Sequence, residues 1–367
     1  MNIAFYIDEM NFRGVANSTF QYAFYNEKIL KNKSIIFFNN KNYRNRNITI
    51  KKFKSYFKVV GISEFSKIDN YLKKLRLDFV YSQKSGNKDN WISNKINTLA
   101  HSLYPQSLSQ VHGYKYFYVS DWLSKNFSNN KIKYLPYIVN LHKTKKNLRK
   151  KLMINKKSIV FGCHGGDSSF DLKFTHDAII DLVKRKKNIY FLFLNINQFY
   201  KHPNIIFLKG VFDEKYKKQF LNSCDAMLYG RSLGESFGLS CGEFSYLEKP
   251  IISYKFNRHR AHIDQISKSG YLEYGSRHDL QNILNNFKKN NKKLHNRKNK
   301  YINNKPEKVM KVFNNLLKHE KISINFNILD YIINYSSFLV MSYYYLRHKF
   351  YNHYYKYLES ILIYKKK

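Results

Sequence analysis

Two glutamates with seven residues between them, Glu235 and Glu243, are the side chains of this sequence best suited to chemistry. A carboxylate accepts hydrogen bonds from paired hydroxyls, so each of them suits a ribose or another sugar. Glycines at 230, 234 and 238 accompany Glu235, and such residues let the backbone approach a ligand closely. A helix that begins near Gly238 would direct its first N–H groups toward an anion such as a phosphate.

The residues around the two glutamates predict a strand, a loop, a short helix and a second strand. Residues 226–229 and 251–254 are apolar runs typical of buried strands, and Lys249-Pro250 ends the helix between them. Two glutamates at this spacing are also typical of a solvated helix face. The surrounding residues therefore decide between the two interpretations.

Glu235, the run Phe237-Gly238-Leu239, Glu243 and the strand after Pro250 resemble the E-x7-E region of retaining glycosyltransferases with the GT-B fold (glycosyltransferase group 1, family 4-like). In that family the pattern reads roughly E-G-F-G-L-P, then E, then G-x-P-V-I. The departures are Ser236 for a glycine, Ser240 for a proline and Lys249 for a small residue.

The resemblance implies an α/β enzyme of two Rossmann-like domains that face each other across a cleft, with C-terminal helices. It implies that Glu243 holds the ribose of a nucleotide-sugar donor and that Glu235, catalytic in the sense of belonging to the site, contacts the transferred sugar. The amides around Phe237, Gly238 and Leu239, together with Ser240, would orient the donor. A hexosyl-type transfer with retention of configuration is implied, with no metal and no cofactor.

Short apolar runs that alternate with polar or helical segments predict a first parallel sheet. The expected strands are residues 2–7, 34–38, 57–60, 77–81, 96–101, 116–119 and 132–139, with a helix at about 17–30. Ser120 or Asp121 is expected to cap a further helix. The last of these strands resembles the final strand of the family's first domain.

Gly14 and His101 are the candidate site residues of this first half. Gly14 lies where the family has a glycine-rich loop that faces the cleft, and an ordinary turn glycine is the alternative. His101 ends its strand, and ligands of doubly wound sheets bind at that edge. It matches the position of a cleft histidine in the family, so we expect it to be catalytic together with Glu235, with a structural histidine as the alternative.

A charged, helix-prone stretch at 143–151 is the expected linker to a second series of strands, at 158–162, 189–194 and 205–208, with helices at 173–185 and 213–223. In the family the strand at 158–162 is followed by an arginine and later a lysine that hold the diphosphate. Here Cys163 replaces that arginine, and Lys173 is later than usual. Gly165 and Gly166 can still offer N–H groups, and the candidate cations are His164, Lys173 and Arg231.

The domains expected from these patterns are 1–142 on the acceptor side, 143–318 for the donor, and an aromatic-rich helical extension at 319–367. The extension ends in Lys365-Lys366-Lys367. Core helices that pack back onto the first domain are one interpretation of it. A basic, aromatic helix at a membrane interface is the other.

The chain has 367 residues with 65 Lys and Arg against 25 Asp and Glu, a formal charge of +40. Abundant Lys, Asn, Ile, Tyr and Phe with little Gly and Pro are typical of an AT-rich genome, which accounts for part of this charge. The three cysteines lack metal-ligand spacing and are odd in number, which favours a reducing compartment. We expect no signal peptide, and no apolar run reaches about 18 residues. A cytoplasmic location follows, with peripheral membrane contact as an open alternative.

No Walker A pattern, no G-x-G-x-x-G and no Asp-x-Asp are found in the sequence, which fits a metal-independent GT-B enzyme. The expected partners are a nucleotide-sugar donor and a glycan, lipid or protein acceptor, with no specific nucleic acid. The alternative function is a basic protein that binds nucleic acid or membrane on a degenerate GT-B scaffold, which the charge and Cys163 favour.

Overall fold

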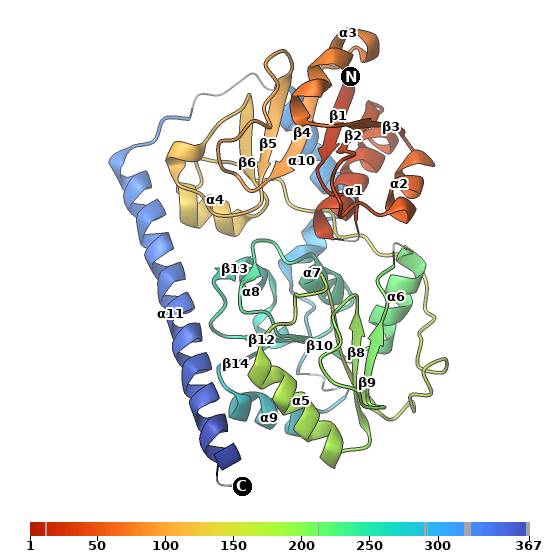
Figure 1. The fold of residues 1–367 in the computed structure, drawn as a ribbon, viewed down its shortest axis with the longest axis vertical. Helices are drawn as coiled ribbons and strands as arrows, with labels where there is room; N and C mark the ends of the chain where they lie inside the picture. Colours follow the sequence, from red (N-terminus) through yellow and green to blue (C-terminus); the bar gives the residue numbers. More distant parts are fainter. Residues whose placement is uncertain (12, 212, 290, 292, 319–323, 365–367) are drawn as a thin grey trace. The chain divides into compact units, whose positions relative to one another are not determined.

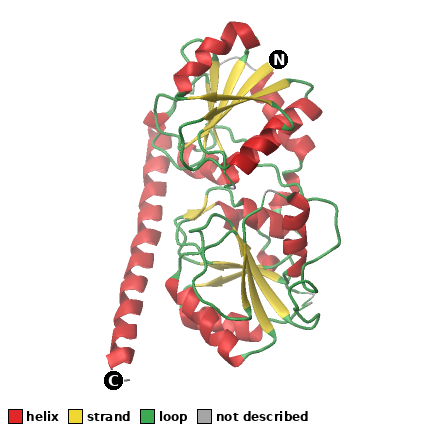
Figure 2. Cartoon of the chain, turned by 45° about the vertical axis from the view of Figure 1, so that its right-hand side comes forward, coloured by secondary structure: helices red, strands yellow, loops and turns green. Residues whose placement is uncertain are grey.

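The computed structural model describes residues 1–11, 13–211, 213–289, 291, 293–318 and 324–364, and of 359–364 the backbone only. The chain divides into two compact units, each with a parallel sheet and helices beside it (Figures 1 and 2). The first comprises Met1–Asn140 and Asn303–Ser337, the second Leu141–Ile302 and Phe338–Lys367. Residues 303–318, assigned from the sequence to the second domain, thus belong to the first unit.

The first unit is built on a six-stranded parallel sheet in the order β3-β2-β1-β4-β5-β6. Its strands are β1 (Asn2–Ile7), β2 (Lys33–Asn39), β3 (Lys58–Ile62), β4 (Phe79–Lys84), β5 (Asn97–Ser102) and β6 (Lys115–Tyr118). Its helices are α1 (Gly14–Lys28), α2 (Asn47–Lys54), α3 (Leu72–Leu75), α4 (Asp121–Ser128) and α10 (Pro306–Lys318). This strand order is that of dinucleotide-binding Rossmann domains.

Aromatic side chains form much of the core of this unit. Phe313 of α10 packs against Phe5, Tyr22 and Tyr81, with ring centroids 5.6 to 6.2 Å apart. Such contacts are favourable beyond the apolar area that they bury. They explain why α10, although far along the chain, belongs to the first unit.

Two predictions about the first unit are corrected. The helix expected at 17–30 begins at Gly14 and ends at Lys28, so Gly14 is a helical residue rather than a loop residue. Residues 132–139 are not a strand: only Tyr134 forms a bridge, with Tyr118. The pairing stops because Pro136, after the Leu135 N–H bond to Tyr118, has no N–H to donate. The capping prediction is confirmed, since the Ser120 side chain accepts from the Leu123 N–H.

The second unit repeats the topology of the first, with a six-stranded parallel sheet in the order β14-β12-β10-β7-β8-β9. Its strands are β7 (Ile159–His164), β8 (Ile189–Leu194), β9 (Ile205–Leu208), β10 (Ala226–Tyr229), β12 (Ile251–Tyr254) and β14 (Tyr271–Tyr274), and a small separate sheet pairs β11 (Gly234–Glu235) with β13 (His259–Arg260). Its helices are α5 (Lys173–Arg185), α6 (Glu214–Ser223), α7 (Leu239–Tyr246), α8 (Ala261–Gln265) and α9 (Arg277–Asn286). The strands predicted at 189–194, 205–208, 226–229 and 251–254 and the helix at 173–185 are confirmed residue for residue.

The charged stretch at 143–151, predicted as helix-prone, contains no helix. Several of its backbone groups bond to side chains of α6. Asn222 donates to the carbonyls of Thr144 and Lys146, and the Leu148 N–H donates to Ser223 Oγ at 2.8 Å. Tertiary hydrogen bonds therefore replace those that a helix would make.

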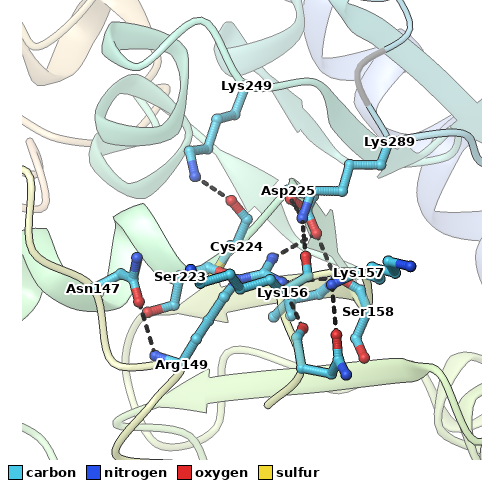
Figure 3. A network of polar contacts seen from close by, with 12 residues as sticks. Asn147, Arg149, Lys156, Lys157, Ser158, Ser223, Cys224, Asp225, Lys249 and Lys289 are labelled. Atoms are coloured by element: carbon cyan, nitrogen blue, oxygen red, sulfur yellow. Dashed lines mark hydrogen bonds and ion pairs between the residues drawn. The ribbon is translucent and has the colours of Figure 1, made fainter.

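A buried ion pair fixes this stretch to the start of the sheet (Figure 3). Arg149 Nη2 lies 2.7 Å from Asp225 Oδ2, and the guanidinium also donates to the carbonyls of Ser158 and Ser223. Asp225 Oδ2 accepts from the Val160 N–H at 2.8 Å as well. The network thus ties the entries of β7 and β10, the two central strands, to each other.

The C-terminal segment forms one helix, α11 (Ile328–Tyr364), the long blue helix in Figure 1. Its beginning belongs to the first unit, where Asp330 pairs with Lys131 at 2.6 Å and Asn334 donates to the carbonyls of Gln106 and Phe127. Its remainder belongs to the second unit. Lys365, Lys366 and Lys367, the basic end of the predicted extension, lie outside the described residues. Within the part of the chain that is described, no helix has the length and apolar character needed to cross a membrane.

Replacing Arg149 with Met is expected to lower the free energy of unfolding by about 3 kcal/mol, because Asp225 loses its more buried cation and keeps the more exposed Lys289 at 3.4 Å. Urea denaturation measures this difference. Arg297→Met is the matched control: its ion pair with Glu248 lies at the surface, so the loss is expected to stay below about 1 kcal/mol. Equal losses in the two variants would contradict the structural role of the Arg149 network.

Candidate active site

The candidate site of the second unit lies at the carboxyl ends of β7 and β10. These strands are neighbours in the sheet, and the strand order reverses between them. Ligands of doubly wound sheets bind at such a switch point. β7 ends at His164 and continues into Gly165 and Gly166, while β10 ends at Tyr229 and leads through Gly230 to Arg231.

Gly234 sets the backbone that presents Glu235. It has a φ of 73°, and a Cβ at this position would collide with the His259 carbonyl oxygen. The close approach allows Gly234 and Glu235 to pair with His259 and Arg260 in the small sheet. A glycine is therefore required immediately before this glutamate.

Glu235 has one carboxylate oxygen engaged by neighbouring groups. Tyr229 donates its hydroxyl to Oε1 at 2.9 Å, and Arg231 donates from Nη1 to the same atom at 3.0 Å. The side chain is 23% exposed. The carboxylate therefore has lone pairs and surface left to accept from a ligand hydroxyl.

Glu243 is the centre of a buried trio of ionisable side chains. Lys217 Nζ of α6 lies 2.6 Å from its Oε1, and His164 Nε2 at the end of β7 lies 2.9 Å from its Oε2. Lys217 also pairs with Glu214 at 3.0 Å. The Glu243 residue is only 1% exposed, whereas the His164 side chain is 14% exposed. The Lys217 side chain is 12% exposed, so both partners of Glu243 keep some exposed surface.

Glu243 and Lys217 stabilise each other's ionised forms. Burial alone would raise the pKa of the Glu243 carboxyl, but Lys217 and His164 more than offset it, and the pKa is lowered. Burial alone would lower the pKa of Lys217, but the carboxylates of Glu243 and Glu214 raise it. At neutral pH Glu243 is therefore an anion and Lys217 a cation.

The start of α7 supplies backbone donors beside the glutamates. Gly238 is the N-cap with a φ of 84°, and a Cβ there would press on His262 and Tyr301. The Phe237 carbonyl accepts from the Tyr301 hydroxyl at 2.7 Å, which fixes the turn. The first N–H groups of α7, from Leu239 and Ser240 onward, have no acceptor within the helix. Both residues are half-buried, so these groups lie near the surface.

In the double glycine after β7, the backbone groups of Gly165 already have hydrogen-bond partners within the unit. The Gly165 N–H donates to the Leu194 carbonyl at 3.4 Å, and its carbonyl accepts from Asn195 Nδ2 at 2.6 Å, so this residue continues the sheet. The space beside Gly166 is open.

Cys163 is buried, and burial, followed by the charge of Glu235, raises the pKa of its thiol.

Among the predicted cations, Arg231 and His164 lie beside the two glutamates. Lys173, the first residue of α5, forms an ion pair with Asp177 at 3.0 Å on its own helix. Arg231 pairs with Glu235, and His164 with Glu243. The structure thus places one of the candidate residues beside each glutamate.

The two candidates of the first unit have different surroundings. His101 has no exposed surface, its Nδ1 lies 2.7 Å from the Tyr81 hydroxyl, and its ring packs against Phe117. Burial lowers its pKa to about 3, so the ring is neutral at neutral pH. Gly14 is exposed at the start of α1, with open space where a side chain would be.

Lys217 is the site residue that sequence reasoning missed. It is one of many lysines, and nothing in its local sequence distinguishes it. A glutamate buried in α7 needs a cation near it, but the sequence does not show which lysine supplies it. Within the described part of the chain, no group of three or more His, Cys, Asp or Glu side chains is placed to hold a metal ion.

Comparisons with solved structures show a shared fold at low sequence identity. A glycosyltransferase from Rickettsia africae ESF-5 is 15% identical with a TM-score of 0.62, covering 86% of this chain and 97% of that chain. Alr3699/HepE of Anabaena in complex with UDP and glucose is 12% identical with a TM-score of 0.64, covering 87% and 100%. MnaA of S. aureus in complex with UDP is 9% identical with a TM-score of 0.58, covering 89% and 100%.

These likenesses, together with the two Rossmann-type sheets, confirm the prediction of a GT-B fold. No protein-family model matches the sequence, and no curated protein matches it significantly.

Lys217→Met is expected to lower the free energy of unfolding at pH 7 by about 3 kcal/mol, because Glu243 loses a buried partner. The pKa of Glu243 lies below its ordinary value of 4.5. Its ion pairs therefore contribute stability above pH 4.5, and this contribution is lost as the pH falls through the lowered pKa. The difference between wild type and variant should thus shrink in acid, as denaturation at a series of pH values can measure.

Lys173→Met is the matched control, because it removes a lysine from a partly exposed pair on a helix surface. Its expected effect is below about 1 kcal/mol at every pH. If Lys217→Met behaved like this control, the buried trio would not hold the site together.

Proposed function

We propose that this chain is a glycosyltransferase that moves a sugar from a nucleotide-sugar donor to an acceptor, with retention of configuration and without a metal. The observation that carries the proposal is the pairing of Glu235 with Arg231 and of Glu243 with His164 at the switch point of the second sheet. The UDP and glucose that Alr3699/HepE holds, and the UDP of MnaA, support a nucleotide-sugar donor.

The diphosphate of the donor would meet cations and amides. In this proposal the diphosphate lies between the two glutamates, in the open space beside Gly166. Arg231 and the first N–H groups of α7 would donate to it. Loss of a nucleoside diphosphate from the sugar places negative charge on a phosphate, and fixed donors aimed at that charge stabilise the transition state. These groups would stabilise the negative charge that a metal ion stabilises in other sites.

Glu235 would accept hydrogen bonds from the hydroxyls of the transferred sugar. Its pairing with Tyr229 and Arg231 fixes one oxygen and leaves acceptor capacity on the carboxylate. Because this contact exists only when the sugar is present, it can contribute to turnover without contributing to the binding of the bare nucleotide.

Glu243 would accept from the ribose, but it is almost completely covered in this structure. In this proposal a ribose reaches it when the His164 ring, which lies beside Oε2, turns aside. His164 would then face the diphosphate, as the cation at the end of the strand where Cys163 replaces the arginine of the family pattern. In this proposal the trio is the closed form of the ribose subsite.

A catalytic role for His101 and a cleft-facing role for Gly14 stay predictions. The His101 ring has no exposed surface within its unit, and Tyr81 engages its Nδ1. A cytoplasmic location and the identity of the acceptor, whether glycan, lipid or protein, stay expectations from the sequence.

Glu235→Gln and Glu243→Gln are expected to change different quantities, the first turnover and the second nucleotide affinity. Glu243→Gln should weaken binding of the nucleoside diphosphate and of the nucleotide sugar alike, by about tenfold, the effect of losing one hydrogen bond to a charged group. Glu235→Gln should leave nucleotide affinity nearly intact and lower turnover. Calorimetry with nucleoside diphosphates and a transfer assay with the matched donor, chosen by a thermal-shift screen, measure both.

An equal loss of nucleotide affinity in the two variants would contradict the assigned roles. Wild-type protein that binds no nucleoside diphosphate would favour the alternative, a basic binding protein on a degenerate scaffold. Folding of each variant is checked by its unfolding midpoint, since Glu243 also belongs to the buried trio.

A further inference from the structure

The part of α11 that belongs to the second unit turns tyrosines inward, and these both pack on the Phe174 ring and form hydrogen bonds. Polar groups face its own unit: Tyr355 donates to Asp177 at 2.8 Å and accepts from Arg277 at 3.0 Å, and Tyr351 accepts from the Arg277 N–H. His348 lies 3.3 Å from the Tyr254 hydroxyl on the same face. Helices on globular domains normally turn their apolar side inward.

The outward face carries an apolar stripe, formed by Leu339, Tyr343, Leu346, Phe350, Tyr354 and Tyr357. These residues recur every three or four positions and therefore lie along one side of the helix. Each is between 51% and 70% exposed. A contiguous apolar surface of this kind on a folded protein marks a place where something else binds.

Cations border the apolar stripe. A pocket of about 770 Å³ opens beside it, and Leu346 and Phe350 of the stripe line the pocket together with Arg258, Lys349 and Lys356. His348 and His353 also line it, and none of its described lining residues is acidic. The pocket therefore suits an anion that also has an apolar part.

Two of these cations each lie beside the same aromatic ring, that of Tyr345. The Arg258 guanidinium lies 5.0 Å from the Tyr345 ring centre, and the Lys349 ammonium lies 4.9 Å from it. Both cations also line the pocket, so its surface is positive. A guanidinium there can bind a phosphate through bidentate contacts.

We propose that this face of α11 binds the surface of an anionic lipid bilayer, with the apolar stripe in the interfacial layer and a lipid headgroup phosphate in the pocket. Tyrosines suit that layer, because the ring is apolar and the hydroxyl is polar. The cations favour anionic lipid, as the formal charge of +40 does for the whole chain. That same charge opposes the pairing of two copies of the chain through this face. The proposal is independent of donor binding at the glutamates.

Flotation of the full-length protein with vesicles tests the proposal. Wild type should bind vesicles of equal parts phosphatidylglycerol and phosphatidylcholine, bind pure phosphatidylcholine weakly, and lose binding as salt rises from about 0.05 to about 0.5 M. The variant L346S/F350S/Y354S should bind anionic vesicles at least about tenfold more weakly than wild type. K349Q/K356Q should also lower anionic binding severalfold, without changing binding to phosphatidylcholine.

Matched controls alter equally exposed residues away from α11. Y43S/I48S/M153S removes three exposed apolar side chains, and K150Q/K151Q removes two exposed lysines. Both controls should bind vesicles like wild type. All variants change exposed residues, so unchanged unfolding midpoints and nucleotide binding are expected throughout.

Three results would overturn the proposal. These are a wild-type protein that does not float with anionic vesicles, stripe or lysine variants that bind like their controls, and a wild-type dimer in sedimentation that L346S/F350S/Y354S converts to a monomer. The last result would assign the stripe to self-association instead.

Discussion

The carboxylate of Glu243 is the charge on which the geometry of the candidate site depends. A carboxylate buried to this depth without partners would cost on the order of several kcal/mol, so it must be compensated. Lys217 and His164 compensate it, one at each oxygen. Because the three residues come from α7, α6 and β7, the compensation fixes these elements relative to one another. The start of α7 and the end of β7 are thereby held at one place.

Two further constraints complete the arrangement. The Arg149 network ties the beginnings of β7 and β10, while the Gly234 turn and the Arg231 pair set Glu235 at the end of β10. One glutamate is thus buried beside Lys217 and His164, and the other is partly exposed with acceptor capacity left. This difference between two carboxylates of one motif supports the division of roles between ribose and sugar.

Local sequence patterns were sufficient for most of the second unit. The strand at 226–229, the start of α7 at Gly238 and the strand after Pro250 follow from apolar runs bounded by glycine and proline, which act locally. The glutamates were found because their spacing lies inside a recognisable glycine pattern. Local hydrogen-bonding groups also identified Ser120 as a cap.

Features set by distant contacts could not be predicted in this way. Lys217 acquires its role from a carboxylate on another helix, and the stretch at 143–151 loses its helix to side chains of α6. Residues 132–139 have a strand-like composition, but Pro136 ends their pairing after one bridge. The inward and outward faces of α11 depend on which residues meet Asp177 and Arg277, which its mixed tyrosine-rich sequence does not show.

Hydrogen exchange of the backbone amides tests most directly the central claim that the carboxyl edge of the second sheet binds a nucleotide-sugar diphosphate. The protein is exchanged with and without the nucleoside diphosphate that stabilises it most in a thermal screen, and with the matching nucleoside as a control. The account predicts that the diphosphate, far more than the nucleoside, slows exchange in residues 164–168 and 230–243, which contain Gly166 and the start of α7. Unchanged exchange in both segments, with protection elsewhere in the chain, would contradict it.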